Sequence, residues 1–283
     1  MSKRAKNVLY NILLTVCIAV FAVSAFFLVR YVLESRKSQG RFDELAQMAT
    51  RPPQSPSEPA GTDPSAASEK EYPGCEMVID PKTGEEIPVL YEYVELFKQN
   101  FDLVGWMQIE DTKLNYPVMQ TPGKKDYYLR RDFDKEHSSH GSLYVRGLCD
   151  VFAPSDNLTI YGHNMRDGSM FAVLHKYESK EFWQDHPIVI FSTLSERHEY
   201  EIFSVFKTSA TEGKGFPYHL FVDAFHEQQF DDYVQTCKEL SMYDTEITPV
   251  YGDKLITLST CDYTQENGRL VVVARRLPEF LPE

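Results

Sequence analysis

Residues 254–275 read KLITLSTCDYTQENGRLVVVAR, and this stretch decides the fold. Two runs rich in apolar and β-branched residues flank a short polar segment, a pattern that predicts two neighbouring strands joined as a hairpin. Cys261 lies where the first strand ends, and Arg269 lies where the second begins. Because a hairpin returns the chain to the end of the sheet that it left, we expect both side chains at the same rim.

Cys261 and Arg269 point to nucleophilic chemistry when a histidine joins them. A cysteine nucleophile needs a base or a cation that favours its thiolate, and a donor for the developing oxyanion. Arg269 remains charged at any working pH. His163 follows another strand-like run, residues 157–161, and imidazole can protonate a leaving amine and later deprotonate an attacking one. On these residues alone, a structural Cys261 and a solvated His163 remain open.

Composition excludes several classes of function. The five cysteines contain no Cys-x-x-Cys pair, which argues against a zinc knuckle or a thioredoxin-type redox pair. His137 and His140 have no third ligand at a spacing typical of a metal site, so we expect no metal site and no cofactor. A net charge of −13 argues against a nucleic-acid partner, which normally requires a basic face.

The N-terminus predicts a membrane anchor. Residues 8–33 form a nearly uninterrupted apolar run that follows three basic residues. Because about 22 helical residues span a hydrocarbon core of about 30 Å, we expect one transmembrane helix, with residues 1–7 in the cytoplasm. The alternative is a cleaved signal peptide, since Val23-Ser24-Ala25 has small residues at the right spacing. The apolar run continues beyond that point, which favours an uncleaved anchor.

Two further regions follow the anchor. Residues 34–76 contain a Pro/Ser-rich stretch with few large apolar residues, which predicts an extended linker. Residues 77–283 have the pattern of a globular domain with many short strands, which predicts a mixed or closed antiparallel β-barrel with flanking helices. We expect a strand pair within 78–90, strands at 158–161, 188–191, 200–208, 254–259 and 270–275, and helices at 93–101, 169–177 and 225–242.

At this point the sequence resembles class B sortases. The resemblance is carried by Tyr161-Gly162-His163-Asn164-Met165, by Thr257-Leu258-Ser259-Thr260-Cys261, and by Gly268-Arg269 with its apolar strand. Gly105-Trp106, Tyr116-Pro117-Val118 and Tyr127-Tyr128-Leu129 also match that class. The similarity covers most of residues 93–277, in the family's order His, Cys, Arg.

The resemblance implies a mostly β fold and a membrane-anchored cysteine transpeptidase. The expected fold is a closed eight-stranded sortase-type β-barrel with flanking helices, including one between the sixth and seventh strands. The expected location is the cell membrane, with a single N-terminal anchor and an extracellular catalytic domain.

The resemblance also assigns roles to residues. Cys261 attacks the carbonyl after threonine in the C-terminal sorting motif of an exported protein, and His163 protonates the departing amine. An amine of peptidoglycan or of its lipid-linked precursor then resolves the thioacyl-enzyme. Arg269 would hold substrate carbonyls or the oxyanion. Substrate binding is further assigned to Leu129, Ser259 and Asp262, the last through its backbone N–H, whereas Lys125 departs from the polar amide of the family.

Two other functions stay open. A pilus-assembling sortase would use a pilin lysine as acceptor, and the lack of a second membrane segment near Leu277–Glu283 favours cell-wall anchoring instead. A non-enzymatic surface protein would carry an inert Cys261. A cysteine L,D-transpeptidase would need a Ser-x-Gly-Cys segment, which is absent, and a papain-type peptidase would place the cysteine before the histidine. Asp80-Pro81-Lys82-Thr83-Gly84 looks like a sorting motif of the Pro-x-Thr-Gly kind, although a hairpin turn is the simpler interpretation.

Overall fold

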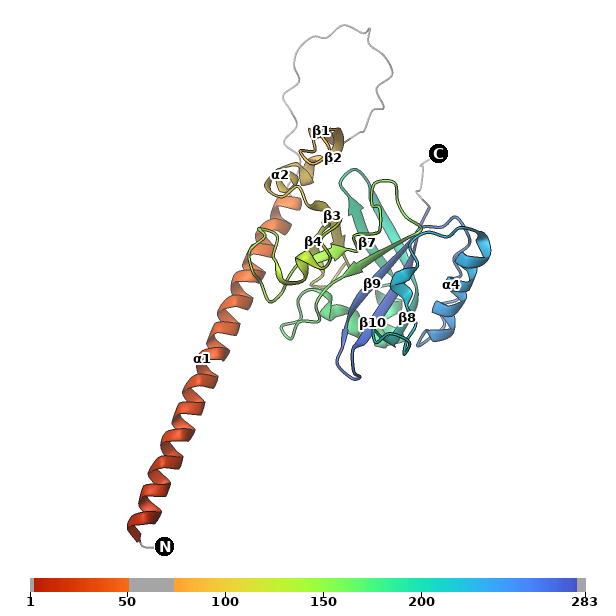
Figure 1. The fold of residues 1–283 in the computed structure, drawn as a ribbon. Coiled ribbons are helices and arrows are strands. Elements are labelled where there is room, and N and C mark those ends of the chain that lie inside the picture. Colours follow the sequence, from red (N-terminus) through yellow and green to blue (C-terminus); the bar gives the residue numbers. More distant parts are fainter. Residues whose placement is uncertain (1–2, 51–73, 279–283) are drawn as a thin grey trace, which may run out of the picture. The chain divides into compact units, whose positions relative to one another are not determined.

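The structure, a computed structural model, describes residues 3–50 and 74–278 (Figure 1). The chain divides into two compact units, residues 1–41 and residues 42–283. Most of the segment expected to be an extended linker, residues 51–73, lies outside the described residues.

The first unit is helical. Helix α1 runs from Lys3 to Ala49, and its part from Tyr10 onward includes a fully exposed 18-residue window with a mean hydropathy of 2.9. This helix is long and apolar enough to cross a membrane. It continues well past residue 33, where the linker was expected to begin. Residues 34–49 contain one glycine and no proline, so nothing in them ends the helix before Pro52.

The second unit is built on a closed barrel of eight strands, as expected from the resemblance. In chain order these are β3 (Leu103–Gln108), β4 (Asn115–Met119), β5 (Leu143–Val145), β6 (Asn157–Tyr161), β7 (Ile188–Thr193), β8 (Arg197–Ser209), β9 (Leu255–Asp262) and β10 (Gly268–Arg276). Around the barrel the order is β10-β8-β7-β3-β4-β5-β6-β9. The barrel is mixed, because β4 pairs with β5 and β6 pairs with β9 in parallel, whereas the other pairs are antiparallel.

Short elements flank this barrel. They are β1 (Cys75–Ile79), β2 (Glu86–Leu90), α2 (Tyr91–Gln99), η1 (Tyr127–Arg130), η2 (Phe171–Glu178), α3 (Lys180–Asp185), η3 (Tyr218–Leu220) and α4 (Glu227–Leu240), of which the η elements are 3₁₀ helices. Helix α4 follows the sixth barrel strand and precedes the seventh, as expected. Strands β1 and β2 form the predicted hairpin, and the Gly84 N–H donates to the Asp80 carbonyl at 2.7 Å within its turn.

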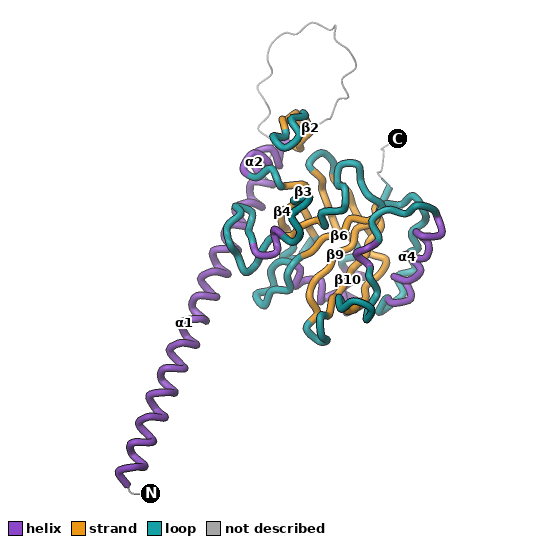
Figure 2. The backbone as a smooth tube through the Cα atoms, viewed as in Figure 1, coloured by secondary structure: helices purple, strands orange, loops and turns teal. Residues whose placement is uncertain are grey.

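Strand β10 is buried on both faces, which explains its unbroken apolar run. Leu270, Val272 and Ala274 belong to the main core inside the barrel, whereas Val271 and Val273 pack into a second core under α4. The helix contributes Phe230, Tyr233, Val234 and Cys237, a spacing that places them on one face. Figure 2 shows β6, β9 and β10 side by side, and this packed wall holds the rim where β9 ends.

Candidate active site

The hairpin of β9 and β10 places Cys261 directly opposite Arg269. Opposed residues of an antiparallel pair project to the same face and lie about 5 Å apart at their Cβ atoms. Gly268 pairs with Asp262 at the point where the chain returns, and a Cβ on Gly268 would lie 2.4 Å from the Asp262 carbonyl oxygen. Only glycine fits this approach, so the Gly268-Arg269 sequence fixes the register that joins the cysteine and the arginine.

His163 reaches the same rim through the parallel pairing of β6 with β9. Tyr161 is in register with Ser259, so two residues further along each chain come His163 and Cys261. Two hydrogen bonds continue this pairing past the strand, from the Gly162 N–H to the Ser259 carbonyl at 3.2 Å and from the Thr260 hydroxyl to the Gly162 carbonyl at 2.8 Å. The barrel therefore brings the three predicted catalytic residues to one end of adjacent strands.

His163 is held as a neutral imidazole. Its Nε2 lies 2.7 Å from the Leu129 carbonyl oxygen, so Nε2 carries the hydrogen and donates it. Burial lowers the pKa of His163 below its ordinary value of 6.5, and the positive charge of Arg130 lowers it further, while the Leu129 bond opposes both effects. At neutral pH the other ring nitrogen is therefore free to accept a proton.

A groove connects the three residues with two of the three predicted substrate-binding residues. Its volume is about 630 Å³, within the range of small-molecule and peptide pockets. His163, Cys261 and Arg269 line it together with Leu129 and Ser259. The Ser259 hydroxyl is fixed by a hydrogen bond of 2.6 Å to the Tyr218 hydroxyl.

Arg269 keeps its charge available to the groove. Its Nη1 donates to the Gly268 carbonyl at 2.8 Å and to the Asn267 carbonyl at 3.3 Å. Within the part of the chain that the structure describes, Arg269 forms no ion pair with a carboxylate. A guanidinium without a carboxylate partner can donate to substrate carbonyls or to an oxyanion.

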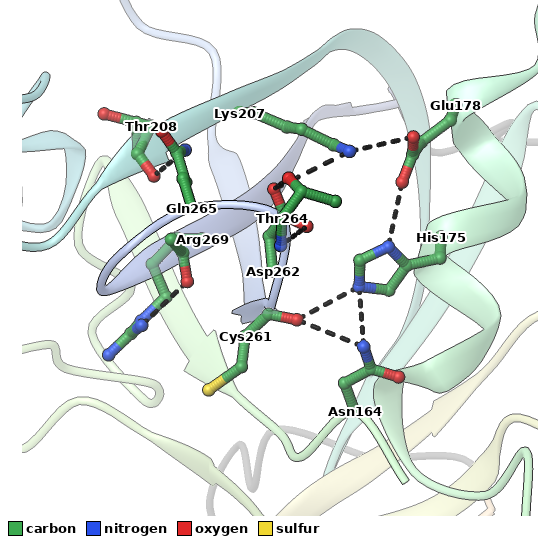
Figure 3. A network of polar contacts seen from close by, with 11 residues as sticks. Asn164, His175, Glu178, Lys207, Thr208, Cys261, Asp262, Thr264, Gln265 and Arg269 are labelled. Atoms are coloured by element: carbon green, nitrogen blue, oxygen red, sulfur yellow. Dashed lines mark hydrogen bonds and ion pairs between the residues drawn. The ribbon is translucent and has the colours of Figure 1, made fainter. Parts of the chain in front are cut away.

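A polar network lies on the opposite side of Cys261 from its thiol (Figure 3). Asn164 Nδ2 donates to the Cys261 carbonyl oxygen at 3.2 Å, and His175 Nε2 lies 3.0 Å from that oxygen and 2.9 Å from Asn164 Nδ2. His175 Nδ1 lies 2.9 Å from Glu178 Oε1, so the carboxylate orients the ring. These contacts fix the backbone of the cysteine. The sequence pattern did not predict this role of Asn164, His175 and Glu178.

The same network extends to the residue after the cysteine. Lys207 Nζ lies 2.9 Å from Glu178 Oε2 and 3.6 Å from Asp262 Oδ2. Burial opposes ionisation of Asp262, but two hydrogen bonds from Thr264 and the charge of Lys207 lower its pKa below the ordinary value. The Asp262 side chain is thus engaged away from the groove and does not line it. Of the expected substrate-binding residues, Asp262 contributes no side chain to this site.

The other cysteines of the folded unit differ from Cys261. Burial raises the pKa of the Cys149 and Cys237 thiols, and burial with nearby Glu92 raises that of Cys75. None of these three lines the groove. Among the described residues there is also no group of three His, Cys, Asp or Glu side chains that could hold a metal ion.

Comparison with known proteins agrees with this geometry. The Sortase domain family matches residues 107–277. Sortase B of Listeria monocytogenes is 37% identical over 183 residues, which cover 64% of this chain and 72% of the relative. Sortase B of Staphylococcus aureus is 31% identical over 186 residues, which cover 65% and 74%. The structure of a Staphylococcus aureus sortase B–substrate complex superposes with a TM-score of 0.67 at 25% identity, covering 87% of this chain and 98% of the other.

The family match spans more than half of the chain and includes the strands that carry His163, Cys261 and Arg269. The barrel, the order of these residues along the chain and the sequence identity all indicate the same family. The chain belongs to the sortase family of cysteine transpeptidases, in its class B.

Proposed function

We propose that this sortase cleaves the sorting motif of exported proteins after threonine, through a thioacyl-enzyme on Cys261, and transfers the acyl group to a cell-wall amine. The main support for the proposal is that three functional side chains from adjacent strands line one groove. Cys261 and Arg269 are cross-strand partners, and His163 arrives at their level from the parallel neighbour strand. A nucleophile, a base and an oxyanion donor are what acyl transfer requires.

The first half-reaction forms the thioester. Neutral His163 accepts the thiol proton at the ring nitrogen that does not bond Leu129, and the Cys261 sulfur attacks the carbonyl carbon of the threonine. The negative oxygen of the tetrahedral intermediate is stabilised by Arg269 and by the backbone N–H of Asp262. The intermediate then collapses, the C–N bond breaks, and the imidazolium gives its proton to the departing amine.

The second half-reaction runs the same steps with another amine. An amino group of peptidoglycan or of its lipid-linked precursor attacks the thioester carbonyl and loses its proton to His163. Collapse of the new tetrahedral intermediate breaks the C–S bond, and the thiolate recovers the proton from the imidazolium. The free enzyme and an amide-linked surface protein result.

The N-terminal unit suits an enzyme that works at the membrane surface. We infer that residues 8–33 cross the membrane once, that residues 1–7 stay in the cytoplasm and that the catalytic domain faces the outside. The apolar, exposed window of α1 supports this arrangement. Exported substrates and cell-wall amines both occur on that side, so an anchored domain meets both.

A peptide transfer assay tests the proposal. A fluorogenic peptide with a Thr-Gly bond is incubated with the enzyme and an amine acceptor, and both cleavage and the new amide are measured. We expect Cys261→Ala to abolish both products, whereas Cys237→Ala, at the buried cysteine of α4, leaves turnover of the folded enzyme intact. Undiminished product release by Cys261→Ala would exclude the thioacyl mechanism.

Thiol labelling separates this proposal from a surface protein with an inert cysteine. Cys261 is half-exposed in the groove, whereas Cys237 is fully buried. We expect a small alkylating reagent to modify Cys261 far sooner than Cys237 in the native protein. Equal, slow modification of both would support the inert alternative.

A further inference from the structure

One wall of the groove carries positive charge without matching carboxylates. Lys124, Lys125, Arg146 and Arg269 line the groove together with His219, and the carboxylate that lines it is Asp126. Asp126 is already engaged, because the Tyr144 hydroxyl donates to its Oδ1 at 3.0 Å. The concentration of cations is unexpected in a chain whose net charge is −13.

Several other cations of the folded unit are held in ion pairs. Ion pairs with carboxylates hold Lys82, Lys98, Lys135, Lys207, Lys254, Arg275 and Arg276. In residues 3–50 and 74–278, by contrast, none of the four groove lysines and arginines pairs with a carboxylate. Unpaired cations that share a groove repel one another, and an anion that enters the groove relieves this repulsion.

Arg146 and His219 form the fixed part of this wall. Arg146 follows β5 directly, its backbone N–H donates to the Thr159 carbonyl at 2.8 Å, and its guanidinium donates to the His219 carbonyl. Burial lowers the pKa of His219, and the charges of Arg146, Lys125 and Arg269 lower it further. The positive groups therefore lie close together around the imidazole of His219.

The positive wall and His163 occupy different parts of the groove. His163 is bonded to the Leu129 carbonyl, whereas the Arg146 guanidinium is bonded to the His219 carbonyl. Because His163 must face the leaving amine, the carboxyl-terminal side of the sorting motif lies at its end of the groove. The residues before the threonine then extend toward the wall formed by Lys125, Arg146 and His219.

We propose that Lys125, Arg146 and His219 form a subsite for an acidic side chain that precedes the threonine of the sorting motif. This inference rests on the proposed function. The Arg146 guanidinium can donate two parallel hydrogen bonds to a carboxylate, and Lys125 adds a second charge from the exposed rim. A neutral residue leaves these cations unpaired, and a basic one is repelled, so the wall discriminates by charge.

Matched peptides test the subsite. Two series, X-Pro-Ala-Thr-Gly and Ala-Pro-X-Thr-Gly, carry Asp, Asn or Lys at X, so that Asp and Asn differ in charge and hardly in shape. We expect Asp to exceed Asn by about tenfold in kcat/KM at one of the two positions, with Lys lowest. The advantage should shrink at high salt, because screening weakens charge selection.

Substitutions in the groove test which residues cause the preference for the Asp peptide. Lys125→Glu should reverse the order of the Asp and Lys peptides, and Arg146→Gln should remove most of the Asp advantage. The matched control is Lys214→Glu, which changes charge by the same amount at an exposed lysine outside the groove, and it should keep the wild-type order. Equal rates for Asp and Asn at both positions, or an Asp preference that both groove variants retain, would overturn the subsite while leaving the transpeptidase reaction intact.

Binding to Cys261→Ala separates this inference from the proposed function. Fluorescence anisotropy with labelled peptides should show tighter binding of the Asp peptide even though no turnover occurs. Charge-selective binding without cleavage by the wild type would contradict the proposed function and support the subsite. If the same protein instead binds inorganic pyrophosphate in a Lys125-dependent manner and ignores the peptide charge, the wall serves the phosphates of an acceptor and the proposal fails.

Discussion

The two sides of Cys261 are built in opposite ways. On the carbonyl side, Asn164 donates to the backbone oxygen, His175 lies against both of these groups, and Glu178 orients His175 (Figure 3). On the thiol side, the described residues give the Cys261 sulfur no hydrogen-bond partner, and it opens into the groove. The backbone of Cys261, the proposed nucleophile, is therefore fixed, whereas its sulfur is open to the groove. Such preorganisation lowers the cost of reaching the reactive geometry.

The charged groups on the carbonyl side and on the thiol side of Cys261 also differ. The network side alternates in sign, from Glu178 through Lys207 to Asp262, so each charge faces one of opposite sign. The groove side carries Arg269 without a carboxylate partner and His163 in its neutral form. Groups already paired within the protein can hold a structure, while unpaired groups can act on a substrate. We therefore propose that the network side positions Cys261 and that the groove side carries out the chemistry.

The largest expected effect is on the groove side. We expect His163→Ala and Arg269→Ala each to lower kcat/KM by at least about 10²-fold, the scale of lost acid–base or oxyanion groups. Arg269→Lys should recover only part of the rate, since it keeps the charge but loses the planar fork. Steady-state kinetics with the Thr-Gly peptide measures this, and unchanged circular dichroism controls for folding. A loss below about threefold in either alanine variant would contradict the assignment.

A smaller effect is expected on the network side. His175→Ala removes the ring that lies against the Cys261 carbonyl and Asn164, and should lower kcat by about tenfold with little change in KM, because it loosens the position of Cys261 and touches no substrate. His175→Gln offers an amide group in place of the ring and should restore part of kcat. Lys176→Ala, on the same 3₁₀ helix but outside the network, is the control. If His175→Ala raised KM and left kcat unchanged, His175 would act on substrate binding instead.

The smallest expected effect is a difference between the two sides of Cys261 in how the stability of the fold depends on pH. The lowered pKa of His163 means that the folded protein binds fewer protons than the unfolded chain just below pH 6.5, so its stability falls as pH drops through that window. Glu178 and Asp262 also have lowered pKa values, but their contribution is complete above about 4.5 and is lost only at lower pH.

Urea unfolding at pH 7.5 and at pH 5.5 tests this difference. We expect His163→Gln to lose less unfolding free energy between these pH values than the wild type, by less than about 1 kcal/mol. Glu178→Gln should be destabilised at both pH values and should keep the wild-type slope. A slope that changes with Glu178→Gln and not with His163→Gln would reverse the assignment.

Part of the fold could be predicted from the sequence. Strands β6 to β10 and the hairpin of β1 and β2 were predicted because their apolar runs are long or bounded by clear turns. Strands β3, β4 and β5 were not predicted as strands, because β3 contains Gly105, β4 contains Pro117 and β5 has three residues. A Cβ on Gly105 would lie 2.2 Å from the Ser192 carbonyl oxygen, so this glycine allows β3 to approach β7.

Part of the candidate site could likewise be predicted from the sequence, and part could not. The Cys261–Arg269 pair followed from hairpin length, and His163 followed from its place after a strand, because both arguments need only local geometry. The partners of the Cys261 carbonyl could not be found that way, since Asn164 and His175 precede the cysteine by 97 and 86 residues. The parallel pairing of β6 with β9 and the packing of η2 against β9 bring them together. Strand β8 places Lys207 beside Asp262, whose side chain does not line the groove.

Mass spectrometry of the acid-quenched enzyme tests whether Cys261 forms a thioacyl intermediate. The enzyme is mixed with a Thr-Gly peptide without any amine acceptor and quenched in acid, and its mass is recorded before and after digestion. We expect an added mass equal to the peptide acyl group up to threonine, located on Cys261, removed by hydroxylamine and absent from Cys261→Ala. An acyl adduct on another residue, or peptide cleavage that proceeds in Cys261→Ala, would contradict this mechanism.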